Sequence, residues 1–381
     1  METDNGRVLS NQHARTDEAF MRRALELARH GLGVASPNPM VGAVLVREGR
    51  TVGEGFHRYE EKKHAEIWAL EQAGADARGS TLYVTLEPCS HYGRTPPCVE
   101  QVIQAGITSV VAAVEDPNPQ VAGSGFRRLK EAGIAVDCGV CQHEASRLNE
   151  AYSHFIRKRR PFVTLKAAMT LDGKVAQADG RSQWITGQAA RDRVQQLRFE
   201  NDAVMTGIGT ILADDSLLTD RTGKARRRPL LRVIVDTRLR LPLKSRLVLS
   251  CVERDLLVFC AVGHGFEQQM QLEALGVDVV AVPVRTGKLD LAALLDELGR
   301  REITSLLMEA GPRLNFDALQ SGLVDKLLCF VAPRILGGSS PLPVIGDPGF
   351  VELDRTFRVK FDSIEHLGED LLLQAYCSGG E

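Results

Sequence analysis

Apolar residues recur along this chain at two spacings, and the alternation between them predicts layered α/β structure. Three- and four-residue spacing over residues 20–28 predicts a helix, and the same period recurs over residues 64–73. Unbroken β-prone runs at residues 40–46 and 82–86 predict buried strands, and the second of them leads directly to Cys89. Strands that alternate with helices in this way favour a sheet with largely parallel pairing.

The second half of the chain repeats the alternation and predicts another α/β unit with its own sheet. Helices are predicted over residues 189–199, 267–275, 289–298 and 314–320, and strands over 162–169, 203–206, 231–235, 256–260, 277–282, 305–308 and 326–332. A basic run at residues 157–160 marks a boundary near 150 to 160. We expect one domain over residues 16–150 and another over 160–381, after a polar, aperiodic segment 1–15 that is expected to be a mobile tail.

Composition agrees with a globular protein of more than one domain. The chain has 381 residues, of which 44% are hydrophobic and 25% charged, and a length of this kind favours two or three domains. A net charge of −2 gives no overall footprint for nucleic acid. No apolar leader and no run of roughly 18 apolar residues is present, so we expect a cytoplasmic protein without a membrane partner. Eight scattered cysteines indicate reduced thiols together with a metal pair.

Candidate chemistry begins with one histidine and two cysteines. His64, Cys89 and Cys98 can supply three protein ligands to zinc and leave the fourth tetrahedral position open, which is the arrangement of a catalytic site. Glu66 lies two residues from the histidine, close enough to act as a proton-transferring base. This pattern matches the H-x-E…P-C…C signature of zinc nucleobase deaminases.

The loop between the two cysteines adds information about the substrate. Cys98 follows Cys89 by nine positions, a longer spacer than the general signature has, and the insert carries His91 and Arg94. An arginine beside a site that handles nucleobases favours a phosphorylated substrate, because its planar fork of donors matches phosphate oxygens. The same residue is also compatible with an ordinary solvated loop.

The second half has weaker signals of its own. Lys166 lies within an apolar strand, where it either snorkels to solvent or faces a cleft and holds a ribose or phosphate. Small residues at 207–210 and 309–312 stand where strands lead into helices, a place suited to phosphate binding. No G-x-G-x-x-G follows a strand, so the Rossmann fingerprint is absent and ordinary turn glycines remain an equal alternative.

Taken together, these motifs closely resemble the bifunctional riboflavin-biosynthesis deaminase-reductase family. The resemblance is carried by residues 38–43, 64–66, 85–98 and 116–119 in the first half and by residues 165–166, 171–174, 182–186, 209–210, 212–215 and 336–338 in the second. It extends over about residues 17–376. It implies an N-terminal cytidine-deaminase-like three-layer domain and a C-terminal α/β domain similar to dihydrofolate reductase, which binds NADPH without a Rossmann fingerprint.

The resemblance also implies an activity and its site residues. The implied deaminase removes the exocyclic 2-amino group of 2,5-diamino-6-(ribosylamino)-4(3H)-pyrimidinone 5′-phosphate, with Zn²⁺ and with substrate contacts at Asn38, His57, His91 and Arg94. The implied reductase then converts the ribosyl chain to ribityl with NADPH. Its implied substrate contacts are Lys166, Ser182, Arg198, Leu218, Arg221 and Glu309. Its implied NADPH contacts are Ala168, Trp184, Thr210, Asp214, Thr237 and Gly311. One departure is Ala310, where many relatives have glycine.

Two other functions stay open at this point. A tRNA- or nucleic-acid-editing zinc deaminase with a C-terminal binding domain would need a basic, aromatic surface, whereas only 5% of the residues are aromatic. A scaffold in which zinc only staples the fold would need a fourth protein ligand, such as His57 or His91. The sequence leaves a homo-oligomer open and gives no domain orientation.

Overall fold

The computed structural model describes residues 4–91, 96–119, 121–176, 184–263, 265–338, 342–346 and 356–377, with side chains from Thr16 onward. The chain forms two compact units. The first consists of residues 1–158 together with 225–227, and the second of residues 159–224 and 228–381. In the described part of the chain, no helix combines the length and the apolar character needed to cross a bilayer.

The first unit is built on a five-stranded sheet with the order β2-β1-β3-β4-β5. Strand β1 pairs antiparallel with β2 and β3, whereas β3, β4 and β5 run parallel. The strands are β1 (Gly42–Arg47), β2 (Arg50–Phe56), β3 (Thr81–Val84), β4 (Ser109–Ala112) and β5 (Ala135–Cys138). The helices are α1 (Asp4–Arg29), α2 (Ala65–Ala73), η1 (Gly74–Ala77), α3 (Cys98–Gln104), α4 (Ser124–Glu131), α5 (Gln142–Leu148) and α6 (Glu150–Lys158).

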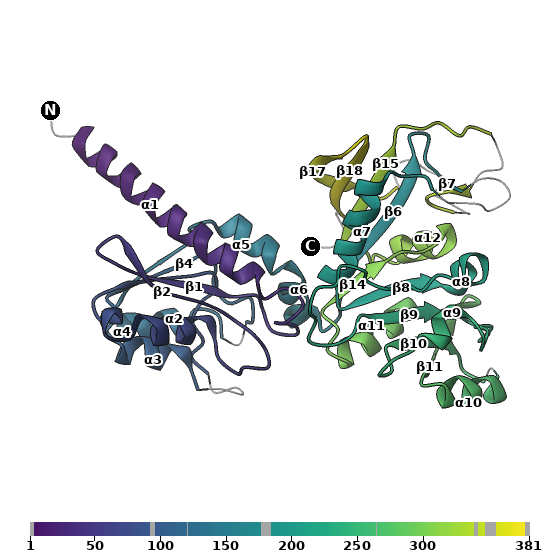
Figure 1. Cartoon of the computed structure of the whole chain (residues 1–381), viewed down its shortest axis with the longest axis horizontal. Helices are drawn as coiled ribbons and strands as arrows, with labels where there is room; N and C mark the ends of the chain where they lie inside the picture. The colour runs from purple at the N-terminus through teal and green to yellow at the C-terminus, as the bar shows by residue number, and fades with distance from the viewer. Residues whose placement is uncertain are drawn as a thin grey trace. The chain divides into compact units, whose positions relative to one another are not determined.

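Alternate residues of these strands enter opposite cores, which makes the first unit three-layered. Ala43 and Leu45 of β1 pack with residues of α2, α3 and α4. Val44 and Val46 pack on the other face with α1 and α5. Figure 1 shows the two groups of helices on opposite sides of the sheet. The two-residue period of a strand therefore determines both layers.

The first helix begins earlier than the sequence period indicates. Helix α1 starts at Asp4, so most of the segment expected to be a tail has helical backbone. The apolar face that packs on the sheet starts only near Phe20 and Met21, which is where the periodic signal begins. Once such an anchored turn exists, each further residue adds a backbone hydrogen bond, so the helix extends into polar sequence.

The second unit contains a nine-stranded sheet with the order β11-β10-β9-β8-β14-β6-β15-β18-β17. Neighbours from β11 to β15 pair in parallel, and β18 and β17 add an antiparallel hairpin. The sheet strands are β6 (Phe162–Thr170), β8 (Ala203–Gly207), β9 (Leu231–Val235), β10 (Leu256–Ala261), β11 (Asp278–Val282), β14 (Ser305–Met308), β15 (Lys326–Ala332), β17 (Val359–Leu367) and β18 (Asp370–Cys377). Short strands are β7 (Lys174–Ala176), β12 (Val284–Arg285), β13 (Lys288–Leu289) and β16 (Leu342–Pro343).

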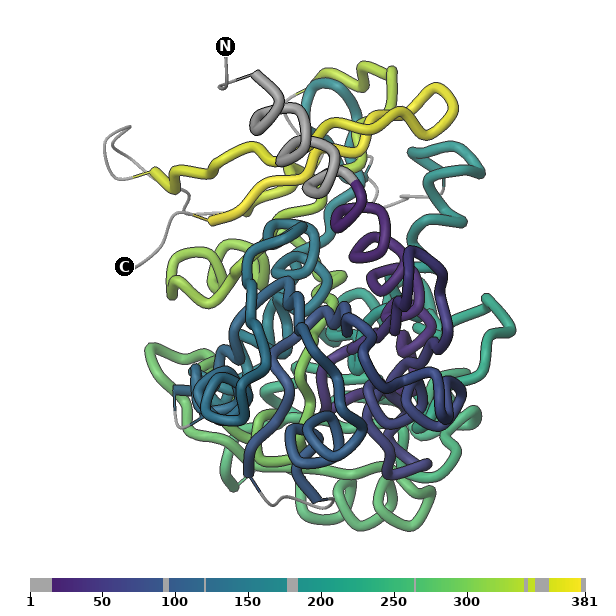
Figure 2. Tube along the Cα trace, turned by 90° about the vertical axis from the view of Figure 1, so that its left-hand side faces the viewer, coloured from purple at the N-terminus to yellow at the C-terminus, as the bar shows by residue number. Residues whose placement is uncertain are grey.

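Helices cover both faces of the larger sheet. The helices are α7 (Gln188–Glu200), α8 (Ile208–Asp214), α9 (Arg246–Leu249), α10 (Phe266–Ala274), α11 (Leu291–Arg300) and α12 (Pro312–Gln320). Helices α11 and α12 pack in one core, and α8, α9 and α10 pack in another, with α7 over β15 and β18. The long hairpin of β17 and β18, yellow in Figure 2, is absent from the sequence prediction because seven of the nine β17 residues are exposed and give no apolar alternation.

Candidate active sites

Three side chains from separate elements of the first unit converge on one point. His64 is the N-cap residue of α2, Cys98 is the first residue of α3, and Cys89 lies in the loop after β3. The Nδ1 atom of His64 lies 2.6 Å from Cys98 Sγ and 3.4 Å from Cys89 Sγ, and the sulfur atoms are 3.3 Å apart. The possible ligand atoms of these three residues all lie within 4.8 Å of one another, close enough to share one metal ion. One nitrogen and two sulfur donors are a set that zinc prefers, so the residues fit this ion.

The electrostatics of the two thiols favour metal binding. The hydrogen bond that Cys89 shares with Cys98 lowers the pKa of Cys89 to about 4, and the imidazole of His64 acts in the same direction. The same hydrogen bond, together with burial, raises the pKa of Cys98. Because the thiolate is the form that ligates metals, a pair that already holds one thiolate at neutral pH is prepared for a cation.

Glu66 lies in the first turn of α2, beside this cluster. Only 3% of the residue is exposed, and burial raises the pKa of its carboxyl group. A carboxyl group with a raised pKa holds a proton more readily than an exposed one, so it can both accept and return a proton, which is what a general acid-base catalyst needs. The structure thus places Glu66 where the sequence predicts a proton carrier.

His57 and Asn38, predicted from the family resemblance as substrate contacts, lie together beside the cluster. The Nδ1 atom of His57 is 2.9 Å from the carbonyl of Lys63, so Nε2 accepts from the Asn38 amide at 3.0 Å. Burial lowers the pKa of His57, which keeps the ring neutral, and the ring meets that of His64 edge-on at 5.4 Å between centroids. Both nitrogens of His57 are therefore occupied, which argues against His57 as a fourth metal ligand.

The two other predicted deaminase contacts lie in the long cysteine loop. His91 is exposed and does not belong to the metal-holding group of the described residues. Arg94 lies outside the described residues. The scaffold hypothesis, which needs a fourth protein ligand, finds none in the described part of this loop.

In the second unit a cavity of about 2110 Å³ opens along the sheet and its helices. A site for one small molecule typically has roughly 300–1000 Å³, so this cavity has room for a dinucleotide and a second ligand together. It is lined by the described residues predicted as reductase contacts, which are Lys166, Ala168, Trp184, Arg198, Thr210, Asp214, Leu218, Arg221, Thr237, Glu309 and Gly311. Ser182 lies outside the described residues. Further basic side chains line the cavity, among them Arg240, Arg285 and Lys288, and they suit phosphate groups.

A buried ionic cluster lies in the wall of this cavity. Arg198 binds Glu309 through both Nε and Nη2, at 2.6 and 3.1 Å, and its Nη1 donates to the carbonyl of Thr219. Lys166 Nζ lies 3.8 Å from Glu309. Burial opposes ionisation of Glu309, yet the charges of Arg198 and Lys166 outweigh it and lower its pKa. Burial lowers the pKa of Lys166. The cluster presents fixed donors and an acceptor, as recognition of a polyhydroxylated ligand requires.

Comparison with known proteins accounts for both sites. Residues 14–114 match the cytidine and deoxycytidylate deaminase zinc-binding region, and residues 161–373 match the RibD C-terminal domain. The riboflavin biosynthesis protein RibD of Actinobacillus pleuropneumoniae is 43% identical over 358 residues, with 94% of each chain covered. The corresponding protein of Escherichia coli is 41% identical, with 94% of this chain and 98% of its own length covered. The chain belongs to the RibD family.

Solved RibD structures have the same fold. That of Acinetobacter baumannii RibD is 39% identical, has a TM-score of 0.85 and is covered to 99%, against 96% of this chain. A Thermotoga maritima structure, described as a diaminohydroxyphosphoribosylaminopyrimidine deaminase/5-amino-6-(5-phosphoribosylamino)uracil reductase, is 36% identical with a TM-score of 0.84 and the same coverage of both chains. The predicted fold class is therefore confirmed, with a cytidine-deaminase-like unit and a RibD reductase unit.

Membership of the RibD family establishes the function of the chain. The protein is a bifunctional enzyme of riboflavin biosynthesis, a zinc-dependent deaminase and an NADPH-dependent reductase. This confirms the predicted activities and both predicted cofactors. The zinc set and the large basic cavity are the features of this structure that fit the two groups.

Sequence reasoning missed the residue that supports the cysteine loop of this RibD chain. Glu87 is 4% exposed, and its carboxylate accepts backbone N–H groups of Asp116, Gly123, Gly125 and Phe126 at 2.8–3.3 Å. One of these donors, Gly123, is the N-cap residue of α4 and two more lie in its first turn, so the carboxylate caps that helix and complements its dipole. The only sequence signal is an acidic residue at the end of an apolar strand, immediately before the Pro-Cys pair.

Two glycines of β2 were also missed. A Cβ atom on Gly53 would lie 2.1 Å from the Ala69 carbonyl oxygen, and one on Gly55 would lie 2.3 Å from that of Ala65. Helix α2 therefore approaches the sheet more closely than any side chain at these positions would allow. Because Ala65 stands between His64 and Glu66, this close approach sets the position of the RibD deaminase residues.

Proposed function

We propose that His64, Cys89 and Cys98 hold the zinc ion and that Glu66 carries protons in the deamination of 2,5-diamino-6-(ribosylamino)-4(3H)-pyrimidinone 5′-phosphate. The observation that carries the proposal is the convergence of three soft and borderline donors beside one buried carboxyl group. When bound, zinc supplies a polarised water at near-neutral pH, which the uncatalysed reaction lacks. The oxo group of the product replaces the exocyclic 2-amino group.

Glu66 has two tasks in this scheme. Its carboxylate takes a proton from the attacking water and then returns protons to the ring nitrogen and to the departing ammonia. Burial raises the pKa of this carboxyl group, which makes the protonated form that returns the proton easier to reach. Its place in the first turn of α2 holds it next to the ligand His64 through every step.

Asn38 and His57 orient the pyrimidine ring. The Asn38 amide nitrogen donates to His57, and this bond turns the amide oxygen of Asn38 toward a ring or exocyclic N–H group of the substrate. His57 is itself fixed by its bond to the Lys63 carbonyl. Arg94, in the long cysteine loop, is proposed to bind the 5′-phosphate, because its cationic fork matches the phosphate oxygens, and His91 of the same loop is proposed as a further substrate contact.

The cavity of the second unit holds NADPH and the deaminated pyrimidine. NADPH supplies the hydride that converts the ribosyl carbon C1′ to a ribityl carbon. Glu309 and Lys166 form a fixed acceptor-donor pair for sugar hydroxyls, and Arg198 keeps Glu309 ionised and in place. Arg221, Leu218 and Ser182 complete the substrate contacts.

The same cavity receives the cofactor. Its proposed contacts are Ala168, Trp184, Thr210, Asp214, Thr237 and Gly311. Backbone groups at the starts of α8 and α12, near Thr210 and Gly311, suit its phosphates, and the basic side chains of the lining supply positive charge.

The domain limits and the surroundings of the enzyme belong to the same proposal. The deaminase is proposed to occupy residues 16–150 and the reductase residues 160–381. A free nucleotide-like substrate requires no nucleic-acid or membrane partner, and two ligating cysteines require a reducing compartment such as the cytoplasm. A homo-oligomer is compatible with this scheme.

One assay tests both halves. The diaminopyrimidine ribotide is supplied with and without NADPH, and ammonia release and NADPH loss are followed separately. We expect Glu66→Gln to retain zinc by metal analysis and to lose ammonia release, while NADPH oxidation with pre-deaminated substrate persists. Glu309→Gln is the matched control, with the opposite pattern. Ammonia release at the parental rate by Glu66→Gln would show that the assignment of this residue is wrong.

A further inference from the structure

An arginine is buried inside the parallel sheet of the second unit. Arg232 lies on β9 among apolar residues, and only 1% of it is exposed. A buried charge is strongly unfavourable unless it is ion-paired and hydrogen-bonded, and a well-packed apolar side chain would often serve stability equally well. The burial of Arg232 is therefore weak evidence that the charge serves stability alone.

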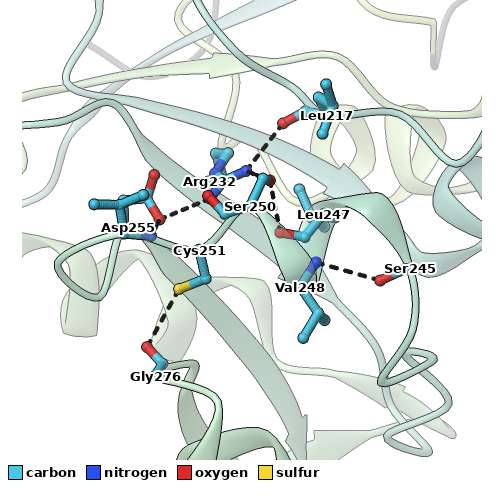
Figure 3. Close-up of polar contacts among 10 residues, drawn as sticks. Leu217, Arg232, Ser245, Leu247, Val248, Ser250, Cys251, Asp255 and Gly276 are labelled. Carbon is cyan, nitrogen blue, oxygen red and sulfur yellow. Dashed lines mark hydrogen bonds and ion pairs between the residues drawn. The ribbon is translucent and has the colours of Figure 1, made fainter.

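The guanidinium of Arg232 bridges two segments of backbone, as Figure 3 shows. On one side, Nη2 binds Asp255 Oδ1 at 2.7 Å and the carbonyl of Ser250 at 3.1 Å, while Nη1 binds Ser250 Oγ at 2.8 Å. On the other side, Nη1 donates to the carbonyl of Leu217 at 3.3 Å. Its Nε finds no partner among the described residues. The side chain is thus directed so that its outer nitrogens reach both segments.

The segment that contains Leu217 is a strained loop in the cavity wall. Residues 215–218 all line the cavity, and Asp215 and Leu218 have φ angles of 42° and 54°. Residues with a side chain avoid this left-handed region, and they keep it only where surrounding contacts over-determine the backbone. Here the carboxylate of Asp215 accepts from the backbone N–H of Arg246 at 2.9 Å, and the side chain of Leu218 is buried.

Two arginines hold this loop from different directions. Arg232 binds the Leu217 carbonyl, and Arg198 binds the Thr219 carbonyl at 2.9 Å. Arg198 is also the residue that holds Glu309 in the cavity wall. A shift of the loop would therefore be transmitted to the acceptor group that faces the ligand.

We infer that Arg232 is a positioning residue of the reductase: it fixes the loop at residues 215–219 so that Leu218 and the Arg198–Glu309 pair face the pyrimidine substrate. Arg232 touches neither substrate nor cofactor and acts through the loop. The inference rests on the proposed placement of the reductase in this cavity. The ion pair with Asp255 holds the arginine in that orientation.

Two variants separate positioning from stability. The double substitution Arg232→Met with Asp255→Leu removes both charges of the pair, and replacing a buried ion pair by apolar residues is often neutral for folding. Arg232→Lys keeps a charge for Asp255, but its single ammonium cannot span both segments. Arg301→Met is the matched control, because Arg301 pairs with Asp278 and Glu297 in the same unit and is not among the residues that line the cavity.

The readouts are KM and kcat for the deaminated pyrimidine, the Kd of NADPH, and the rate of trypsin cleavage after Arg221. A misplaced binding group costs from about tenfold to a hundredfold, so we expect KM for the pyrimidine to rise at least about tenfold in both Arg232 variants. The Kd of NADPH should change less than about threefold, since α8 precedes the loop and keeps its own hydrogen bonds. Trypsin cleavage after Arg221 should accelerate, and ammonia release should be unchanged.

Two results would overturn the inference. One is a parental KM and cleavage rate in both Arg232 variants. The other is a set of changes in KM, kcat and NADPH affinity that all scale with the folded fraction of the variant, as expected for Arg301→Met. Failure of the proposed function is distinguishable, because Glu309→Gln would then leave the reductase unaffected whatever the Arg232 variants do.

Discussion

With Glu87 replaced by glutamine, the deaminase unit should unfold at a markedly lower urea concentration. The carboxylate accepts four backbone N–H groups, two on each oxygen, with 4% of the residue exposed. A glutamine side chain keeps one oxygen and turns an NH₂ group toward the other two donors. Hydrogen bonds to charged groups contribute about 1.5–3 kcal/mol each, so loss of two predicts a destabilisation of about 3–6 kcal/mol.

The chain offers a clean probe for this measurement. It has two tryptophans, and one of them, Trp68, lies in the first unit, whereas Trp184 lies in the second. In a Trp184→Phe background, the fluorescence of Trp68 reports urea unfolding of the first unit alone. Zinc-loaded protein is compared with and without Glu87→Gln, and the zinc content of the folded state is measured alongside.

Glu54→Gln is the matched control for this substitution. Glu54 pairs with Arg23 on the surface of the same unit, with 27% of its side chain exposed. Surface pairs of this kind contribute about 0.2–1 kcal/mol. If Glu87→Gln is no more destabilising than Glu54→Gln, the reasoning that the carboxylate holds α4 and the cysteine loop together is refuted.

Two other predictions concern the same unit. Gly55→Ala forces a Cβ atom to 2.3 Å from the Ala65 carbonyl oxygen, so we expect a destabilisation of about 1–3 kcal/mol and weaker zinc binding in a competition titration. Gly49→Ala is the control: its Cβ atom meets open space and its φ of +74° strains only the turn between β1 and β2, so zinc affinity should be unchanged. Burial lowers the pKa of His154 to about 4, below its unfolded value near 6.5. As the pH falls, the unfolded chain therefore binds a proton before the folded chain does, and the free energy of unfolding decreases between about pH 6.5 and about pH 4. His154→Phe should flatten this pH dependence of the urea midpoint, and an unchanged slope would contradict it.

The convergence of one histidine and two cysteines was predictable from sequence because metal-binding residue types carry their identity in their side chains. His64, Cys89 and Cys98 each follow or begin a segment with a clear period, so their convergence follows from the order of helices and strands. The family resemblance also named both Arg198 and Glu309. It could not show that these two bind each other across 111 positions, because no local pattern links them.

Residues that act on the backbone left much weaker signals. The donors that Glu87 binds are N–H groups 29 to 39 positions away, which every residue except proline possesses. The glycines of β2 resemble weak strand residues until the neighbouring helix is in place. Arg232 is visible in the sequence only as one charge within an apolar run, and its target carbonyl has no side-chain signature.

The two units use the same physical device with opposite charge. Glu87 brings a buried anion to N–H groups of the loop and helix behind the zinc ligands, and Arg232 brings a buried cation to a carbonyl of the loop beside the reductase cavity. Backbone groups stay the same when a loop residue is replaced, so each loop can change its side chains without losing its anchor. The anchoring ion has no such freedom, because a neutral isostere reverses or removes the hydrogen bonds it makes. Substitution of either ion should therefore impair one activity of the enzyme and leave the other intact.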